Sequence, residues 1–179
     1  MKKRILFAIL ASAILICLDQ FVKYIINSTF KVGESLPLID KVFQLTYIQN
    51  QGAAWGSFSG KIPFLLIITI AILICAVYVY IRLARRQDNK YSALRIGLIF
   101  LISGAIGNMI DRVFRGFVVD MFDFCLINFP VFNVADIYVT CSFIFIAILI
   151  MFKYKDDELS DIIHNNANKT SEKKSKASR

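Results

Sequence analysis

The sequence predicts an α-helical membrane protein with four transmembrane helices, both termini cytoplasmic, and a small extracytoplasmic β-containing segment between helices 1 and 2. Hydrophobic residues make up 57% of the 179 residues, and the mean hydropathy is +0.61. A soluble domain is roughly 45–50% apolar. Four stretches are apolar enough to cross a bilayer, which takes about 20 residues. This composition excludes a disordered chain and argues against a water-soluble globule.

The four predicted spans cover about residues 5–26, 62–81, 93–110 and 134–152. The second span contains no charged residue. The third carries only Arg95 and the fourth only Asp136, each near the start of its span. The first span is interrupted by Asp19, Gln20 and Lys23, so polar groups lie within an otherwise apolar stretch.

The basic residues predict the orientation of these spans. Of the 21 Lys and Arg residues, 15 lie before the first span, between the second span and the start of the third (Arg95 included), or after the fourth. Because basic residues concentrate on the cytoplasmic side, both termini are expected there. The net charge of +8 is then mainly an orientation signal, and no aromatic-interleaved basic surface points to nucleic acid. We expect a membrane domain at 1–154 and a polar, disordered cytoplasmic tail at 155–179.

The N-terminus has an alternative interpretation as a cleavable signal peptide. Basic residues at 2–4 precede an apolar run and the sequence Ala11-Ser12-Ala13, which resembles a cleavage site. The apolar core before Ala11 is short, however, and hydrophobicity continues well past it. We therefore favour an uncleaved first span.

The first extracytoplasmic connection is too long for a simple turn. Phe43, Leu45 and Tyr47 alternate with polar residues, and this period of two predicts a half-buried strand. Trp55 suits the lipid headgroup region. We expect this segment to form a platform on the membrane surface.

The cysteines give no sign of a disulfide framework or a metal centre. Cys17, Cys75 and Cys141 lie within spans and are expected to be small buried hydrophobic residues. Cys125 has no extracytoplasmic partner. The single histidine, His164, lies in the tail, and no Cys/His cluster has the spacing of metal ligands. The sequence therefore predicts neither a metal nor a cofactor.

Ionisable residues near a bilayer are costly and are often functional. Here they gather at the extracytoplasmic boundary: Asp19, Lys23, Asp111, Arg112, Asp120, Asp123 and Asp136. Several have a structural explanation, since Asp19 and Lys23 form an i,i+4 pair on one helix face. Asn133 and Asp136 have the spacing of a capping box. Asn108 follows small residues that allow close helix approach, so it could simply bond across a helix interface.

Asp120 is harder to explain structurally because it stands within the apolar run Phe117–Phe122. Asp123 is its rival. Two carboxylates in an apolar setting share one proton and can act together as general base and general acid. Serine chemistry lacks a base, because His164 is predicted on the other side of the membrane. The pattern suggests an aspartic peptidase, while a small proton-coupled carrier and a non-enzymatic scaffold remain alternatives.

Four blocks of the sequence resemble those of bacterial lipoprotein signal peptidase, or signal peptidase II. They are Asp19-Gln20-Phe21-Val22-Lys23, Asn50-Gln51-Gly52-Ala53-Ala54-Trp55, Gly107-Asn108-Met109-Ile110-Asp111-Arg112 continuing to Val118-Val119-Asp120, and Phe132-Asn133-Val134-Ala135-Asp136. Their order, spacing and four-span topology match from about residue 4 to 152. Trp55 and Met121 stand where the family more often has Phe, and both keep a bulky apolar side chain.

The resemblance implies an aspartic endopeptidase of the bacterial plasma membrane with its active site at the extracytoplasmic face. The family removes the signal peptide of prolipoproteins by cutting just before a diacylglyceryl-modified cysteine, and globomycin inhibits it. Membrane lipid would be a further partner. Carried over to this sequence, Asp120 and Asp136 would be catalytic. Substrate-binding or supporting residues would be Asn50, Gly52, Asn108, Arg112 and Asn133, and structural supports would be Asp19, Lys23 and Asp111.

Overall fold

The computed structural model describes residues 1–52, 60–86 and 89–154. In chain order the elements are α1 (Lys2–Thr29), β1 (Ser35–Ile39), β2 (Phe43–Asn50), α2 (Ile62–Arg85), α3 (Ser92–Phe114), β3 (Val118–Asp123) and α4 (Val134–Phe152). All four helices are long and apolar enough to cross a membrane, as the sequence predicts. Trp55 and the tail, about which the sequence also makes predictions, lie outside the described residues.

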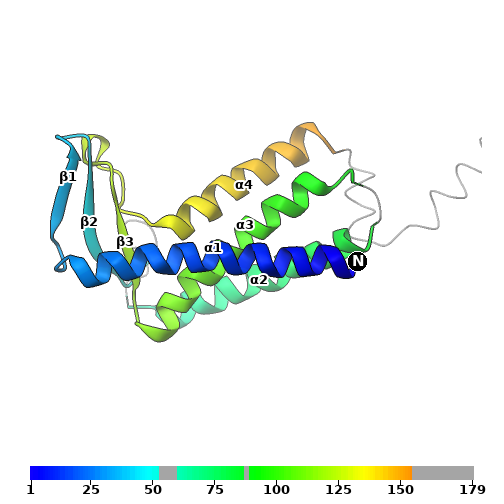
Figure 1. Ribbon diagram of the computed structural model, residues 1–179, viewed down its shortest axis with the longest axis horizontal. Helices are drawn as coiled ribbons and strands as arrows, with labels where there is room; N and C mark the ends of the chain where they lie inside the picture. Colours follow the sequence, from blue (N-terminus) through cyan, green and yellow to red (C-terminus); the bar gives the residue numbers. More distant parts are fainter. Residues whose placement is uncertain (53–59, 87–88, 155–179) are drawn as a thin grey trace, which may run out of the picture.

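The helices run alongside one another, and the strands lie across one end of them (Figure 1). α3 is the central helix because it packs against α1, α2 and α4, and it is the most buried of the four. α1 begins and α4 ends at the helix end away from the sheet (Figure 1). The end of α1, the end of α3 and the start of α4 lie beside the sheet (Figure 1), so the polar residues singled out from the sequence gather at that end.

The sheet has the order β1-β2-β3, and both pairings are antiparallel. The strand predicted from the alternation in 43–47 is confirmed as part of β2. β3, which the sequence analysis did not identify, comes from the connection between α3 and α4. It places Val118 opposite Asn50 and Asp120 opposite Ile48. The sheet thus joins two chain segments that are far apart in sequence.

Alternation along β3 determines which way its side chains face. Val119 and Met121 are fully buried in a cluster with Tyr47 and with Ile26 of α1. Because successive side chains of a strand point to opposite faces, Asp120 points away from this cluster. Asp120 is nevertheless buried, with 2% of its surface exposed.

Glycines on α3 allow the neighbouring helices to come very close. A Cβ atom on Gly104 would lie 2.5 Å from the carbonyl oxygen of Ala135 on α4. A Cβ atom on Gly107 would lie 2.6 Å from Oδ2 of Asp19 on α1. Both distances are shorter than non-bonded atoms tolerate. The prediction that small residues permit close helix contact is therefore confirmed at both positions.

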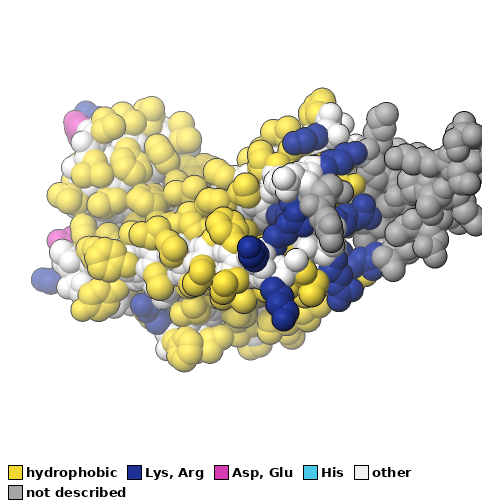
Figure 2. Space-filling view, turned by 45° about the vertical axis from the view of Figure 1, so that its right-hand side comes forward, with side chains coloured by type: hydrophobic (Ala, Val, Ile, Leu, Met, Phe, Trp, Pro, Cys, Tyr) yellow, Lys and Arg dark blue, Asp and Glu magenta, His cyan; other side chains and the backbone are white. Residues whose placement is uncertain are grey.

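The helices expose many apolar side chains, and these cover much of the face shown in Figure 2. Cys17, Cys75 and Cys141 are exposed as well, so the prediction that they are buried is wrong. The reason is that lipid tails are as apolar as these side chains. An apolar residue in a span therefore gains little from moving into the protein interior.

Candidate active site

The site begins at the N-terminus of α4, where Asn133 and Asp136 form the predicted capping box. Oδ1 of Asn133 accepts from the backbone N–H of Asp136 at 3.0 Å. Oδ2 of Asp136 in turn accepts from the backbone N–H of Asn133 at 3.1 Å. The two bonds satisfy N–H groups that a helix start otherwise leaves unpaired, and they fix the Asp136 carboxylate rigidly.

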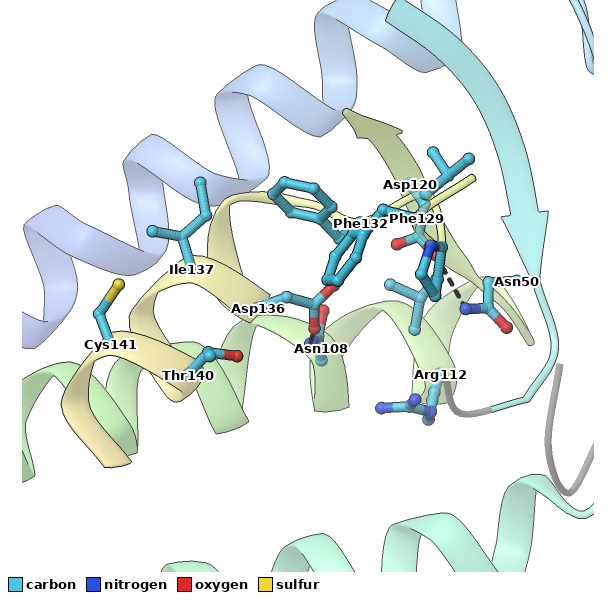
Figure 3. A pocket seen from close by; sticks show the side chains of 13 residues that line it. Asn50, Asn108, Arg112, Asp120, Phe129, Phe132, Asp136, Ile137, Thr140 and Cys141 are labelled. Carbon is cyan, nitrogen blue, oxygen red and sulfur yellow. Dashed lines mark hydrogen bonds between the residues drawn. The ribbon is translucent and has the colours of Figure 1, made fainter. Parts of the chain in front are cut away.

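Asn133 also reaches the second carboxylate, because its Nδ2 donates to Oδ1 of Asp120 at 2.6 Å. Nδ2 of Asn50, at the end of β2, donates to Oδ2 of Asp120 at 2.8 Å (Figure 3). Both oxygens of Asp120 are thus held by neutral amides. Asn133 binds both carboxylates at once, so we call Asp120 and Asp136 the carboxylate pair.

Asn108 of α3 connects the carboxylate pair to a buried cation. Its Nδ2 donates to Oδ1 of Asp136 at 2.7 Å, and the two side chains lie together in Figure 3. Its Oδ1 accepts from Nζ of Lys23 at 3.0 Å. Asn108 therefore serves as more than a link between helices, since it joins Lys23 of α1 to Asp136 of α4.

Lys23 lies in a fully buried ion cluster with Asp19 and Asp111. Nζ of Lys23 is 3.0 Å from Oδ2 of Asp19 and 2.9 Å from Oδ2 of Asp111. The carboxylates also accept backbone N–H groups: Ala135 donates to Asp19 at 2.9 Å, and Val119 donates to Asp111 at 3.3 Å. The cluster therefore fastens the start of α4 and strand β3 to α1 and α3.

Two further side chains contact this cluster: Gln20, which received no role from the sequence, and Arg115, whose i,i+4 spacing from Asp111 predicts an ion pair. Nε2 of Gln20 donates to the carbonyl of Gly107 at 3.2 Å and to Asp19 at 3.1 Å. Arg115 forms an ion pair with Asp111, four residues earlier on α3. The i,i+4 spacing of Arg115 was a usable signal. Gln20 stands next to Asp19 in the first block, but nothing in its spacing pointed to α3.

Arg112 extends the site toward the connection after β2. Its Nη2 donates to the carbonyl of Gly52 at 3.1 Å, and the N–H of Gly52 donates to Oδ1 of Asn50 at 2.9 Å. Nε of Arg112 is buried and has no hydrogen-bond partner among the described residues. A buried donor without a partner is costly, so Nε is available to a ligand carbonyl.

The environment of Asp120 favours its protonated form. Burial and, second, the negative charge of Asp136 raise the pKa of Asp120 from its ordinary 3.8 to about 7. Hydrogen bonds from Asn133 and Asn50 oppose this rise. Asp120 is therefore close to half protonated at neutral pH, as general acid–base chemistry requires.

A cavity of about 470 Å³ opens beside the carboxylate pair, and it is mostly apolar. Its walls come from the segment 129–132 and from Ile137, Thr140 and Cys141 on α4 (Figure 3). The sequence analysis missed these lining residues. They carry no charge and, apart from Phe132 in the fourth block, belong to no recognisable motif, so only the fold identifies them as lining residues.

A second cavity of about 530 Å³ borders the first and is more polar. Both are lined by Asn50, Asp120 and the segment 129–131. Asp120 therefore lies where an apolar cavity and a polar cavity meet. A substrate with an apolar part and a polar part could place the boundary between them at this carboxylate.

Asp123, the sequence-based rival of Asp120, does not line the apolar cavity. Its Oδ2 accepts from Nε2 of Gln44 at 2.7 Å and from Oγ1 of Thr46 at 2.9 Å. It therefore joins β3 to β2 and borders only the polar cavity. Within the described ranges, no group of three or more His, Cys, Asp and Glu side chains is arranged to hold a metal ion.

Known proteins resemble this chain over most of its length. The sequence model of the signal peptidase (SPase) II family matches residues 11–152. A lipoprotein signal peptidase of Brevibacillus brevis is 46% identical over 131 residues, covering 73% of this chain and 85% of the relative. One of Staphylococcus aureus is 43% identical over 146 residues, covering 80% and 87%.

Solved structures give the same result at the level of the fold. One structure of a bacterial membrane enzyme matches with a TM-score of 0.73 and 39% identity, covering 84% of this chain and 92% of the other. A second matches with a TM-score of 0.70, also at 39% identity, covering 83% and 94%. The fold, the relatives and the family match all lead to one conclusion: the chain belongs to the signal peptidase II family.

Proposed function

We propose that Asp120 and Asp136 are the catalytic pair of this membrane-bound aspartic peptidase. As a multi-pass bacterial membrane protein of its family, the chain removes signal peptides from prolipoproteins. Membership of this family argues against the two alternative functions, a small proton-coupled carrier and a non-enzymatic scaffold. The observation that carries the residue assignment is Asn133, which donates to Asp120 and caps the helix together with Asp136. Asn133 thus holds a carboxylate of β3 and a carboxylate of α4 in one site.

The two carboxylates differ in their surroundings, which suggests different roles. Asp136 lies in the first turn of α4, where the helix dipole favours a negative charge. Asp120 is bound by two neutral amides, and its pKa is about 7. We therefore assign the shared proton to Asp120 and the negative charge to Asp136 in the resting enzyme.

The proposed reaction uses this distribution. Ionised Asp136 takes a proton from a water molecule, and the water oxygen attacks the scissile carbonyl carbon. Asp120 gives its proton to the carbonyl oxygen. The tetrahedral intermediate then collapses, the C–N bond breaks, and a proton passes from the carboxylate pair to the leaving amine. Asp136 gives the proton it took from water to the leaving nitrogen, and Asp120 recovers its proton from a hydroxyl group of the intermediate as the carbonyl re-forms, so both carboxylates return to their starting states.

The neighbouring polar side chains would position the substrate. Nε of Arg112 is a donor without a protein acceptor among the described residues, so it can bind a substrate carbonyl. Asn50 and Asn108 keep the carboxylate pair oriented. Asn50 also holds Gly52, whose carbonyl accepts from Arg112. Such positioning lowers the entropic cost of reaching the transition state.

The meeting of the two cavities suits a lipid-modified substrate. We propose that the apolar cavity takes the apolar part of the substrate near the diacylglyceryl-modified cysteine, while the polar cavity takes a hydrophilic segment. The distribution of basic residues supports an orientation with the sheet and the carboxylate pair outside the cytoplasm. The lipid can then remain in the membrane while the peptide bond reaches water.

The direct test is a cleavage assay with the purified full chain and a diacylglyceryl-modified precursor. We expect a shortened product whose new N-terminus is the modified cysteine, and we expect globomycin to suppress it. An unmodified precursor of the same sequence is the matched control. Equal cleavage of both precursors would contradict the proposed recognition of the lipid, and a cut elsewhere in the chain would contradict the proposed site of cleavage.

A further inference from the structure

We propose that a cavity at the helix end opposite the sheet binds the headgroup of an anionic phospholipid. The cavity measures about 280 Å³ and lies between the start of α1, the later part of α2 and the start of α3. We call it the basic cavity. Among the described residues, it shares no lining residue with the two cavities at the carboxylate pair. The proposal is therefore independent of the peptidase mechanism.

The lining of the basic cavity is cationic. Lys3, Arg4 and Arg95 line it, and none of its described lining residues is acidic. Along the chain, the sequence 82–95 contains five basic residues and a single acid, Asp88. Figure 2 shows Lys and Arg side chains gathered at this end of the molecule. Such basic pockets between transmembrane helices favour anionic headgroups.

Two helix N-termini add to this positive potential. Lys3 and Arg4 lie in the first turn of α1, and Ser92 is the first residue of α3. In the described structure neither helix has a side-chain cap or an acidic residue in its first turn. The positive ends of both helix dipoles are therefore available to an anion.

Hydrogen bonds hold the walls of the basic cavity in place. Arg4 donates to the carbonyl of Arg86, and the hydroxyl of Tyr80 donates to the carbonyl of Arg4 at 2.9 Å. Arg95 donates to the carbonyl of Leu83 at 3.2 Å and to Oγ of Ser92 at 2.8 Å. The cavity is therefore largely organised before a ligand arrives, which reduces the entropic cost of binding.

An apolar wall distinguishes a lipid from a free phosphate ion. Phe7 of α1 and Ile96 of α3 line the cavity and are 61% and 49% exposed. Both belong to membrane-spanning helices, so their exposed surfaces face acyl chains. A phospholipid can place its phosphate among the cations and its chains along these side chains, whereas inorganic phosphate gains only the first contact.

The test is a titration of the detergent-solubilised full chain with phosphatidylglycerol, with bound lipid counted by native mass spectrometry. We expect one tightly retained phosphatidylglycerol molecule and at least roughly fivefold weaker binding of zwitterionic phosphatidylcholine. Inorganic phosphate should not displace the lipid. If inorganic phosphate displaces it readily, the cavity is a site for soluble anions and the lipid proposal is overturned.

Two matched pairs of variants locate the site. Lys2 and Lys3 are both exposed, but only Lys3 lines the cavity. We expect Lys3→Gln to weaken phosphatidylglycerol binding roughly fivefold, and Lys2→Gln to leave it nearly unchanged. Ser92→Asp keeps an acceptor for Arg95 and suits a helix N-terminus, yet its charge should weaken binding at least roughly fivefold. Ser92→Asn, which has the same shape without the charge, should bind the lipid like the parent.

Equal losses in Lys2→Gln and Lys3→Gln would show diffuse attraction to basic residues and would overturn the proposal. Unchanged binding in Ser92→Asp would overturn the proposed position of the headgroup. The tail offers a rival occupant, because its sequence contains Asp156, Asp157 and Glu158. Neutralising these three should not alter lipid binding, and a marked increase would assign the cavity to the tail instead.

Discussion

The sheet end of the molecule contains two buried groups of carboxylates that differ in the side chains contacting them. Asp19 and Asp111 lie against Lys23 at 3.0 and 2.9 Å, and Arg115 also pairs with Asp111. Asp120 instead accepts its hydrogen bonds from neutral amides. Cations neutralise the negative charges of the first group. The second group lowers its negative charge by binding a proton.

This difference explains how one small domain can contain both a structural and a reactive set of acids. Asp19 and Asp111 both pair with Lys23 and accept the N–H groups of Ala135 and Val119, so they fix the backbone. Asp120 is buried beside a second carboxylate, and this environment leaves a proton on it that is available for chemistry. Asn108 contacts both groups, accepting from Lys23 and donating to Asp136.

The largest expected effect is on the carboxylate pair itself. Asp120→Asn and Asp136→Asn should each lower the rate of precursor cleavage at least about a thousandfold, because each removes a general acid or base. Both variants should still insert and fold, since Asn retains one acceptor oxygen and nearly the same shape. Cleavage of the lipidated precursor and thermal unfolding in detergent measure the two properties.

Full cleavage activity in either variant would remove that residue from the catalytic pair. If a variant lost its fold together with its activity, the carboxylate pair would have a structural role. The two groups of acids would then not differ in function. Asn133→Ala is a useful companion, because it removes the residue that contacts both carboxylates while leaving both acids present.

The second effect tests the structural group. Lys23→Met leaves Asp19 and Asp111 buried without their shared cation, which should cost about 3–5 kcal/mol of stability. Thermal unfolding in detergent measures the loss. Combining Lys23→Met with Asp111→Asn removes one of the two buried charges that lost their cation. The double variant should therefore be more stable than the sum of the single effects predicts. Strict additivity would show that Lys23 and Asp111 do not act as an ion pair.

The third effect concerns the close approach that brings Asp19 beside α3. Gly107→Ala would place a methyl group 2.6 Å from Oδ2 of Asp19, so we expect a loss of about 1–3 kcal/mol. Gly97→Ala is the matched control on the same helix. Its nearest neighbour is the side chain of Ile146 at 2.9 Å, which can rotate away. Similar unfolding temperatures for both variants would mean that the ion cluster tolerates displacement.

The sequence alone predicted the four spans, the strand in 43–47 and the capping box at Asn133, because each depends on local periodicity or spacing. The i,i+4 pair of Asp19 and Lys23 was predictable for the same reason. Family resemblance then separated Asp120 from Asp123, which the residues alone left open.

The remaining features depend on contacts between segments distant in sequence. β3 is a short strand with buried residues on both faces, so it lacks the alternation that reveals a half-buried strand. The bond of Gln20 to Gly107 joins two helices that have no shared pattern. The burial of cysteines was predicted wrongly because hydrophobicity does not separate a lipid-facing surface from a protein interior.

The fourth effect is the pH dependence that the carboxylate pair should confer. Because the pKa of Asp120 is raised to about 7, its folded form binds more protons than its unfolded form between about pH 4 and 7. Its contribution to stability is therefore complete at low pH and is lost as the pH rises through 7. Above that value, cleavage should fall about tenfold per pH unit as the shared proton leaves.

Asp120→Asn should remove this pH dependence of stability, which chemical unfolding in detergent at several pH values would measure. If stability of the parent rose steadily from pH 4 to 8, the protonation assigned to Asp120 would be wrong.

The smallest effect is expected at Asp123, three residues from Asp120 on the same strand. Asp123→Asn weakens the bonds from Gln44 and Thr46 and should cost about 0.5–1.5 kcal/mol. Precursor cleavage should stay close to that of the parent, because Asp123 borders the polar cavity but does not contact the residues that hold the carboxylate pair. An inactive Asp123→Asn beside an active Asp120→Asn would reverse the assignment, and it would show that an acid half-exposed among strand side chains, rather than one enclosed by amides, performs the chemistry.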